Sequence, residues 1–170
     1  LSNYSTGGVW TDSAGIVIVN PIDVSNLNPS TYSYTYTIKN GCGIDAEVVQ
    51  LAVFKTPNIS GATLNAGTTC LGFSNQVNIA NASGLTDGNY TITYTLSGAN
   101  STTSTANATI ASGNGSFIIP ASQLVNSGDI TVTIDSIIAV VSPCGTNGSL
   151  ISPITFKVIC QNLFIVMSQL

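Results

Sequence analysis

The chain has 170 residues, of which only 6% are charged, and three Lys against seven acids give it a net charge of −4. This composition argues against nucleic-acid binding and against a polybasic membrane patch, because both need clustered Lys and Arg. Hydrophobic residues make up 44%, so the chain is not a disordered tract. Its polar residues are mostly Thr, Ser, Asn and Gly, a composition typical of an all-β, extracellular protein.

The first unit is expected at residues 1–56, with strands near Ile16–Val19, Thr31–Ile38 and Ala46–Phe54. In "TYSYTYTI" the apolar side chains alternate strictly with Ser and Thr, which predicts a half-buried strand. Three strands are too few to close two sheets, so a strand is expected to be missing from the N-terminal side of this unit.

The second unit is expected at residues 57–158, the usual size of an immunoglobulin-like sandwich. "NYTITYTL" gives the clearest alternation, and "PASQLVNSG" predicts one helical turn between sheets. One further strand is expected between Asn58 and Thr69. The other predicted strands lie near Gln76–Ala80, Asn89–Leu96, Thr105–Ala111, Ser116–Ile119, Ile130–Val141 and Pro153–Ile159.

The two units share an internal repeat. "LNPSTYSYTYTI", from Leu27, aligns without gaps to "LTDGNYTITYTL", from Leu85, and a Tyr follows each Leu at the same spacing, at Tyr32 and Tyr90. The spacing is typical of a tyrosine corner, in which a Tyr at a strand start bonds back to the upstream backbone. The sequence therefore predicts an all-β fold with two immunoglobulin-like β-sandwich units in tandem.

Residues 159–170 hold a surplus strand, which contains the densest apolar run of the chain: Leu163, Phe164, Ile165, Val166 and Met167. Such a run is an aggregation hazard unless another strand covers it. Placed before residue 1, the tail supplies the strand that the first unit lacks. We therefore expect it to complete the first unit of the next copy in a head-to-tail array. The alternative is that the tail folds back onto its own first unit.

The four cysteines are Cys42, Cys70, Cys144 and Cys160. They form no CxxC pair, and the chain has no His, so disulfides in an oxidising compartment are favoured over a zinc site. We predict a Cys70–Cys144 bridge within the second unit, which leaves Cys42 and Cys160 to join neighbouring copies.

Catalytic chemistry finds little support. Without His, no Ser-His-Asp or Cys-His site is possible, and most acids flank turns or strand ends. Asp87-Gly88-Asn89 is interpreted as a turn rather than a calcium site. Lys39 or Lys55 with Glu47 could belong to an isopeptide site of Lys, Asn and an acid, but these residues are interpreted as exposed charges that protect strand edges. We expect a non-enzymatic protein without metal or cofactor.

Several stretches resemble known repeats. "GGVWTDSAG…YSYTYTIKNGCG" resembles a PKD-like or Ig-like repeat in giant surface proteins of gliding, flavobacterium-type bacteria. "CLGFSNQVNIANASGLTDGNYTITYTLSGANSTTSTANATI" and "GNGSFIIPASQLVNSGDITVTI" resemble the companion repeat of the same proteins. The resemblance implies a secreted, repetitive adhesin or filament at the cell surface, in the style of gliding-motility adhesins. Asp-Ser-apolar triplets at Ser13 and Ser136 resemble the O-glycosylation signal of the same phylum.

The sequence thus favours a structural repeat with a mechanical and adhesive role, whose partners are neighbouring copies of itself and surface glycans. A donor-strand pilin subunit and a carbohydrate-binding module remain as alternatives. Trp10 could stack on a sugar in the latter, although a lone Trp in such a sandwich is more often part of the core.

Overall fold

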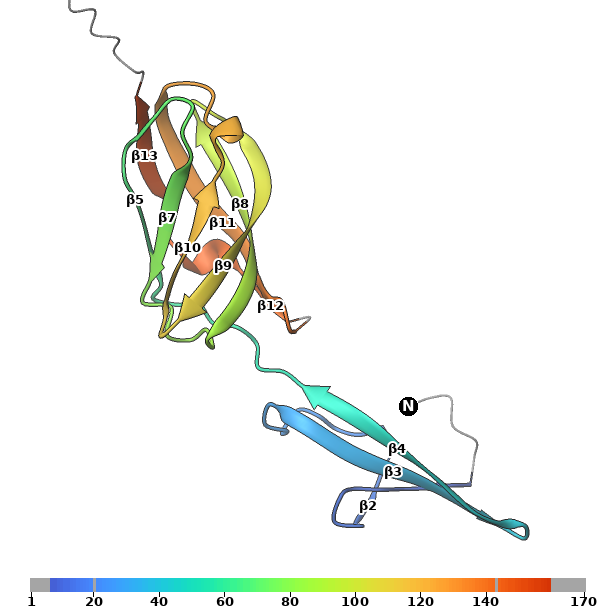
Figure 1. Ribbon diagram of the computed structural model, residues 1–170. Helices are drawn as coiled ribbons and strands as arrows, with labels where there is room; N and C mark the ends of the chain where they lie inside the picture. Colours follow the sequence, from blue (N-terminus) through green and yellow to red (C-terminus); the bar gives the residue numbers. More distant parts are fainter. Residues whose placement is uncertain (1–6, 20, 143, 160–170) are drawn as a thin grey trace, which may run out of the picture. The chain divides into compact units, whose positions relative to one another are not determined.

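The computed structural model describes residues 7–19, 21–142 and 144–159. Every element in these ranges is either a β-strand or a 3-10 helix of one turn, which confirms the all-β class (Figure 1). The chain divides into two compact units between Lys55 and Thr56, called unit 1 and unit 2 below. None of the described helical segments is long and apolar enough to cross a membrane.

Unit 1 is a single antiparallel sheet with the strand order β2-β1-β3-β4. Its strands are β1 (Val9–Thr11), β2 (Val17–Ile18), β3 (Ser30–Asn40) and β4 (Gly43–Val53). The last three were expected from the sequence. The first has only three residues, too few for an alternating pattern to be recognised.

The long hairpin of β3 and β4 is the framework of unit 1. Its turn is closed by Asn40, whose side-chain oxygen accepts the backbone N–H of Cys42 at 2.9 Å. Gly43 follows with a φ of 149°, a conformation that side-chain-bearing residues rarely adopt. The hairpin register then places Tyr34 opposite Val49, so both side chains lie on the same face of the sheet.

Unit 2 contains nine strands among the described residues, in the order β5-β7-β10-β9-β8-β11-β13-β6, with β12 attached to β11. All pairs are antiparallel except β6 with β13, which is parallel. The strands are β5 (Thr63–Ala66), β6 (Thr69–Cys70), β7 (Asn75–Ala80), β8 (Gly88–Gly98), β9 (Thr102–Ala111), β10 (Asn114–Ile119), β11 (Gly128–Ala139), β12 (Gly145–Asn147) and β13 (Ile154–Ile159).

This sheet folds over on itself, so that β7 and β10 pack against β8 and β11 as a β-sandwich (Figure 1). The alternation predicted in "NYTITYTL" is confirmed, because Ile92, Tyr94 and Leu96 are fully buried while the intervening Thr side chains are partly exposed. Tyr94 meets Phe117 of the opposite layer with ring centroids 5.2 Å apart. One continuous core of 23 buried residues therefore stabilises unit 2.

The predicted helical turn between the sheets is also present. It is the 3-10 turn η1 (Ala121–Gln123), and the following Leu124 is fully buried in the core. Gln123 accepts a hydrogen bond from the hydroxyl of Tyr94 at 2.7 Å. A second 3-10 turn, η2 (Gly148–Leu150), connects β12 to β13 and was not predicted.

The internal repeat corresponds to the same local structure in both units. The hydroxyl of Tyr90 donates to the carbonyl oxygen of Thr86 at 2.8 Å, and that of Tyr32 donates to Asn28 at 2.9 Å. The turn before each Tyr is equivalent too, since Leu85 and Leu27 each donate their backbone N–H to the carbonyl three residues upstream. The corner-type hydrogen bond expected from the spacing is thus confirmed twice.

Candidate interaction face of unit 1

The apolar face of unit 1 is defined by the hairpin register, which places Tyr32, Tyr34 and Tyr36 on the same side as Val49 and Leu51. Among the described residues, three form the buried apolar cluster of this unit, against 23 in unit 2. They are Trp10, Tyr34 and Tyr36. The described part of unit 1 forms one sheet, without a second layer over this face, so most of its other apolar residues stay partly exposed.

Trp10 and Tyr36 form the packed end of this face. Their ring centroids lie 4.9 Å apart, and Trp10 is only 5% exposed. Gly8 lies directly on the ring of Tyr36 and donates its N–H to the hydroxyl at 3.0 Å. Trp10 is therefore a core residue, as the commoner role of a lone Trp suggested, and it is not presented on an open loop.

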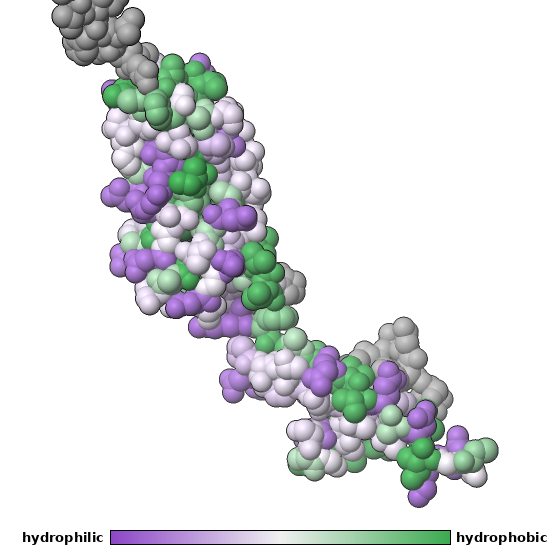
Figure 2. Space-filling view, viewed as in Figure 1, coloured by the Kyte–Doolittle hydropathy of each residue, from purple (hydrophilic) through white to green (hydrophobic). Residues whose placement is uncertain are grey.

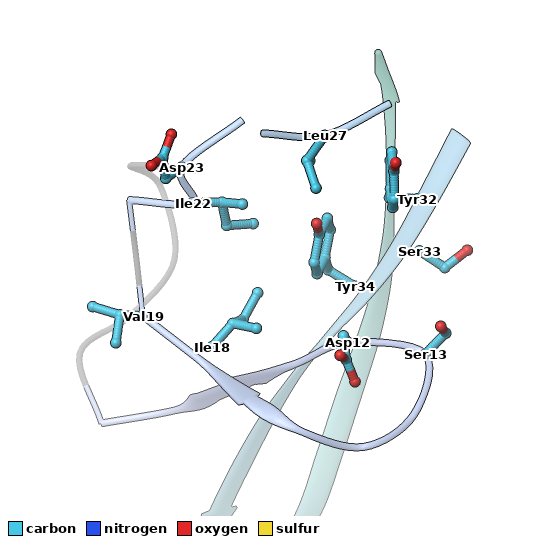
Figure 3. A pocket seen from close by; sticks show the side chains of 10 residues that line it. All are labelled: Asp12, Ser13, Ile18, Val19, Ile22, Asp23, Leu27, Tyr32, Ser33 and Tyr34. Atoms are coloured by element: carbon cyan, nitrogen blue, oxygen red, sulfur yellow. The ribbon is translucent and has the colours of Figure 1, made fainter. Parts of the chain in front are cut away.

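The other end of the face is hollowed around Tyr34. In Figure 3 the side chains of Ile18, Ile22 and Leu27 gather around the ring of Tyr34. These apolar residues come from β2 and from the segment that connects β2 to β3. The hollow is completed by Asp12, Ser13, Val19, Asp23, Tyr32 and Ser33.

A second hollow adjoins the first and shares Ile22 and Tyr34 with it. It extends toward β4, where Val49 and Leu51 form its wall, and Pro21 and Val24 lie on its far side. We call the two hollows together the Tyr34 groove. Green hydrophobic side chains interrupt the surface of unit 1 at several places in Figure 2, and Val24 is 47% exposed.

The two acids beside the groove are occupied by local turns. One carboxylate oxygen of Asp12 accepts the backbone N–H groups of Ala14 and Ile16, each at 2.9 Å. Hydrogen bonds from the backbone and side chain of Ser25 lower the pKa of Asp23 below its ordinary value. Both carboxylates are therefore structural acceptors, and the groove between them is mainly apolar.

The outer edge of β4 runs beside the Tyr34 groove. Among the described residues, this eleven-residue strand pairs only with β3, so one row of its backbone groups faces outward. In unit 2 the last strand, β13, has its outer edge covered by β6, a short strand from the N-terminal part of that unit. No described strand covers β4 in the equivalent way.

The predicted disulfide between Cys70 and Cys144 is wrong. Cys42, Cys70 and Cys144 all carry free thiols in the structure. Cys70 pairs with Ile159 at the end of β13 that lies beside Gly128, whereas Cys144 precedes Gly145, which pairs with Ile138. The two cysteines therefore lie beside Gly128 and Ile138 of β11, which are ten residues apart along that strand. At ~3.3 Å per residue, this is a separation of about 33 Å. Cys70 ends β6 and Cys144 directly precedes β12, so both lie beside strand ends of unit 2, but at opposite ends of the unit.

The other predicted bridge, between Cys42 and Cys160 of neighbouring copies, involves a residue outside the described ranges. Cys42 itself is exposed in the β3–β4 turn. The tail strand, Leu163 to Met167, also lies outside the described residues. Both stay predictions.

The two candidate glycosylation sites differ in accessibility. Ser13 is exposed at the tip of the turn between β1 and β2. Ser136 lies within β11, where it pairs with Thr93 on one side and with Asn147 on the other, and its side chain is only partly exposed. Accessibility therefore favours Ser13 as the attachment site for a sugar.

The remaining candidates have structural roles. Asp87 accepts the backbone N–H of Ser112 at 2.7 Å, and Asn89 accepts the hydroxyl of Thr109 at 2.8 Å, so the Asp-Gly-Asn stretch secures neighbouring strand ends. Lys39, Lys55 and Glu47 are all exposed, as interpreted from the sequence.

The Tyr34 groove was not predicted from the sequence, because its wall at residues 18–27 has no periodic pattern of apolar residues.

No protein-family model and no curated protein matches the chain. The solved structures that are similar include domains 4 and 5 of the S-layer protein SbsC, at 14% sequence identity and a TM-score of 0.27. That match covers 94% of this chain and 74% of the other. A TM-score this low does not establish a shared fold.

Proposed function

We propose that the chain is a non-catalytic structural repeat of an extended bacterial cell-surface fibre of the adhesin kind, in which residues 160–170 of one copy complete unit 1 of the next. The observation that carries this proposal is the edge of β4 beside the Tyr34 groove, which no described strand covers. The role is mechanical, and the resemblance to repeats of gliding-motility adhesins supports the cell-surface setting.

The edge of β4 needs a partner for two reasons. A long uncovered strand edge is a template for pairing with another chain, and native proteins rarely leave one open. The side chains beside it are also apolar, because Val49 and Leu51 line the groove next to this edge. A strand laid along β4 would satisfy the outward backbone groups and cover the groove in one step.

The tail has the properties of such a strand. Leu163 to Met167 are five consecutive apolar residues without a charge, the pattern of a strand that is covered on both faces. Full burial of one large aliphatic or aromatic side chain is worth about 1.5–3 kcal/mol, so docking would gain several kcal/mol. In the order of an array, the tail also precedes unit 1, just as β6 lies near the N-terminal end of unit 2, directly after β5.

The strand order of unit 2 supports an immunoglobulin-like assignment. In the order of the sheet, β5, β7, β10 and β9 take the places of strands A, B, E and D, and β8, β11 and β13 take those of C, F and G. Short β6 then continues the first strand across to the last one. Such sandwiches are common building blocks of cell-surface proteins.

Self-association of full-length variants tests the proposal. Under reducing conditions, the wild type should form concentration-dependent oligomers in analytical ultracentrifugation. Ile165→Asp should abolish them by placing a charge in the middle of the tail run, and Val24→Asp should do so by placing one in the groove. Ser168→Asp and Val17→Asp are the matched controls, because they add the same charge outside the run and outside the groove.

Mixing the two defective variants separates the proposal from its main alternative. Ile165→Asp keeps an intact groove and Val24→Asp keeps an intact tail, so an equimolar mixture should give 1:1 dimers and nothing larger. A tail that folds back onto its own unit 1 would leave the wild type and the mixture monomeric, and the donation between copies would then be rejected. Denaturing electrophoresis of native fibres further separates a covalent array, which gives a giant band, from a pilin of single subunits.

A further inference from the structure

The chain contains an Asn followed by a Gly in three places: Asn40-Gly41, Asn114-Gly115 and Asn147-Gly148. In such a dipeptide the backbone nitrogen of the Gly can attack the side-chain amide of the Asn, because Gly has no Cβ to hinder the approach. The sequence alone does not rank the three. The structure does, because the attack requires a glycine that is not held in place and is helped by a polarised side-chain carbonyl.

Asn40-Gly41 lies at the tip of the β3–β4 hairpin. The ladder ends at the pair of Asn40 with Gly43, so the backbone N–H of Gly41 lies outside it. Asn40, Gly41 and Cys42 are all exposed. A methyl group built on Gly41 would meet nothing within 4 Å. Nothing in the described part of the structure therefore packs on this side of Gly41 and restrains it.

Asn40 also has the hydrogen bond that its reaction needs. The backbone N–H of Cys42 donates to the side-chain Oδ1 of Asn40 at 2.9 Å. Attack of the Gly41 nitrogen on the adjacent Cγ would turn this oxygen into an oxyanion. A donor about 2.7–3.1 Å from an oxygen that gains negative charge stabilises the transition state. The hairpin turn thus supplies a donor at the atom where charge develops.

Asn147 has an equivalent hydrogen bond but a restrained glycine. Its Oδ1 accepts the backbone N–H of Ser149 at 2.8 Å. Gly148, however, is buried, and a Cβ built on it would overlap the carbonyl oxygen of Ile134. The backbone nitrogen of Gly148 therefore cannot turn toward the side chain of Asn147 unless this part of unit 2 first opens.

Asn114 has neither advantage. Its side-chain NH2 group donates to the carbonyl oxygen of Ser112 at 2.9 Å. Gly115 lies within the sheet, where it pairs with Ile79 on one side and with Ile110 on the other. Among the three dipeptides, Asn40-Gly41 is thus the one that combines an unrestrained glycine with a polarised side-chain carbonyl.

We propose that Asn40 deamidates spontaneously in the folded protein, ahead of Asn114 and Asn147. The nitrogen of Gly41 loses its proton and bonds to Cγ of Asn40, the bond from Cγ to the side-chain nitrogen breaks, and ammonia leaves. Water then opens the resulting five-membered imide at one of its two carbonyls, which gives Asp or isoaspartate. Either product carries a carboxylate in place of the amide, so the tip of unit 1 gains one negative charge. The reaction needs only water and does not depend on the fibre proposed above.

Timed incubation of the full chain in reducing, mildly alkaline buffer tests the site. Intact-mass measurement counts the deamidations, and fragmentation in the mass spectrometer locates them. The first should fall on Asn40, and Asn40→Gln should remove it, because Gln would have to form a larger ring. Gly41→Ala should slow it, since the methyl group hinders the attack but meets nothing in the fold. Asn114→Gln and Asn147→Gln are the matched controls and should leave the first deamidation unchanged.

The same incubation in urea separates the effect of the fold from that of the sequence. In the folded chain Asn114 and Asn147 should react at least roughly tenfold more slowly than Asn40, because each needs a local opening. In urea the three sites should react at similar rates. A first deamidation at another Asn, an unchanged rate in Asn40→Gln, an equal preference for Asn40 in urea, or reaction in urea without reaction in the folded chain would each overturn the proposal.

Discussion

Tyr90 and Thr86 are joined twice in unit 2, because the tyrosine hydroxyl lies 2.8 Å from the threonine carbonyl oxygen and 3.1 Å from its hydroxyl. Tyr32 repeats the backbone part of this contact on Asn28 in unit 1. The two corners differ in burial: the contact of Tyr90 is partly buried, whereas that of Tyr32 is exposed. The same motif is therefore expected to contribute unequally to the stability of the two units.

Replacing the corner tyrosines tests this difference. Tyr90→Phe should lower the free energy of unfolding of unit 2 by about 1–2 kcal/mol, because it leaves a partly buried carbonyl without its partner. Tyr32→Phe should cost unit 1 less than about 1 kcal/mol, since water replaces an exposed bond. Urea unfolding followed by circular dichroism for unit 2 and by Trp10 fluorescence for unit 1 measures both. An equal or larger loss at Tyr32 would contradict the expectation.

Gly8 is predicted to be essential to the packing of unit 1. A Cβ at this position would overlap the ring of Tyr36, which itself packs on Trp10. Gly8→Ala should therefore destabilise unit 1 by roughly 1–3 kcal/mol, the usual cost of overpacking. Gly41→Ala is the matched control, because nothing lies within 4 Å of its added methyl group. The single Trp of the chain reports both transitions, and identical midpoints for the two variants would refute the prediction.

Asn100 is predicted to hold the segment that follows η1. Asn100 is 4% exposed, and its side-chain oxygen accepts the backbone N–H groups of Val125 and Asn126. Its side-chain NH2 group donates to the backbone carbonyl oxygen of Asn126. Asn100→Ala removes all three bonds and should cost about 2–3 kcal/mol in the unfolding free energy of unit 2. Asn114→Ala, which removes one exposed bond to Ser112, should stay within about 0.5 kcal/mol. Similar losses in denaturant titrations would count against this role.

Tyr94 is expected to make unit 2 sensitive to alkaline pH. Burial raises the pKa of its hydroxyl, although hydrogen bonds with Ser104 and Gln123 partly oppose the shift. The folded state therefore keeps the proton that the unfolded state loses above pH ~10, so stability is full below that pH and falls as the pH rises further.

Tyr94→Phe separates this effect from general alkaline denaturation. The variant should be less stable at neutral pH, by about 1 kcal/mol for the lost hydrogen bond. Its stability should decline less steeply than that of the wild type once the pH exceeds ~10. Tyr32→Phe, in unit 1, should leave the decline of unit 2 unchanged. Parallel declines for Tyr94→Phe and the wild type in urea titrations would exclude Tyr94 as the cause.

The sequence predicted those features that depend on local pattern. Alternation of Tyr and Ile with Thr located β3 and β8, because a half-buried strand repeats every two residues. The spacing of Leu and Tyr located both corners, because that hydrogen bond spans only four residues. Short strands such as β1 and β12 escaped, since three residues cannot establish a period.

Features that depend on which strands are neighbours were not predictable in this way. The predicted Cys70–Cys144 disulfide was wrong because both cysteines lie beside strand ends, and the sequence does not show at which end of the sandwich each of these strand ends lies. The parallel pairing of β6 with β13 joins segments about 90 residues apart, and the local sequence of neither strand predicts this pairing. The Tyr34 groove was hidden for the same reason, because its walls come from β2, β3, β4 and an irregular segment.

The parallel direction of β6 and β13 also determines how unit 2 responds to a pull on its two ends. Once β5 has separated from β7, force enters β6 from its N-terminal side and leaves β13 at its C-terminal side, so these two strands are drawn lengthwise past each other. Their hydrogen bonds are then loaded together in shear, whereas an antiparallel pair drawn from one end is peeled open one bond at a time. The two residue pairs that the described residues form here thus resist extension more than the length of the contact suggests.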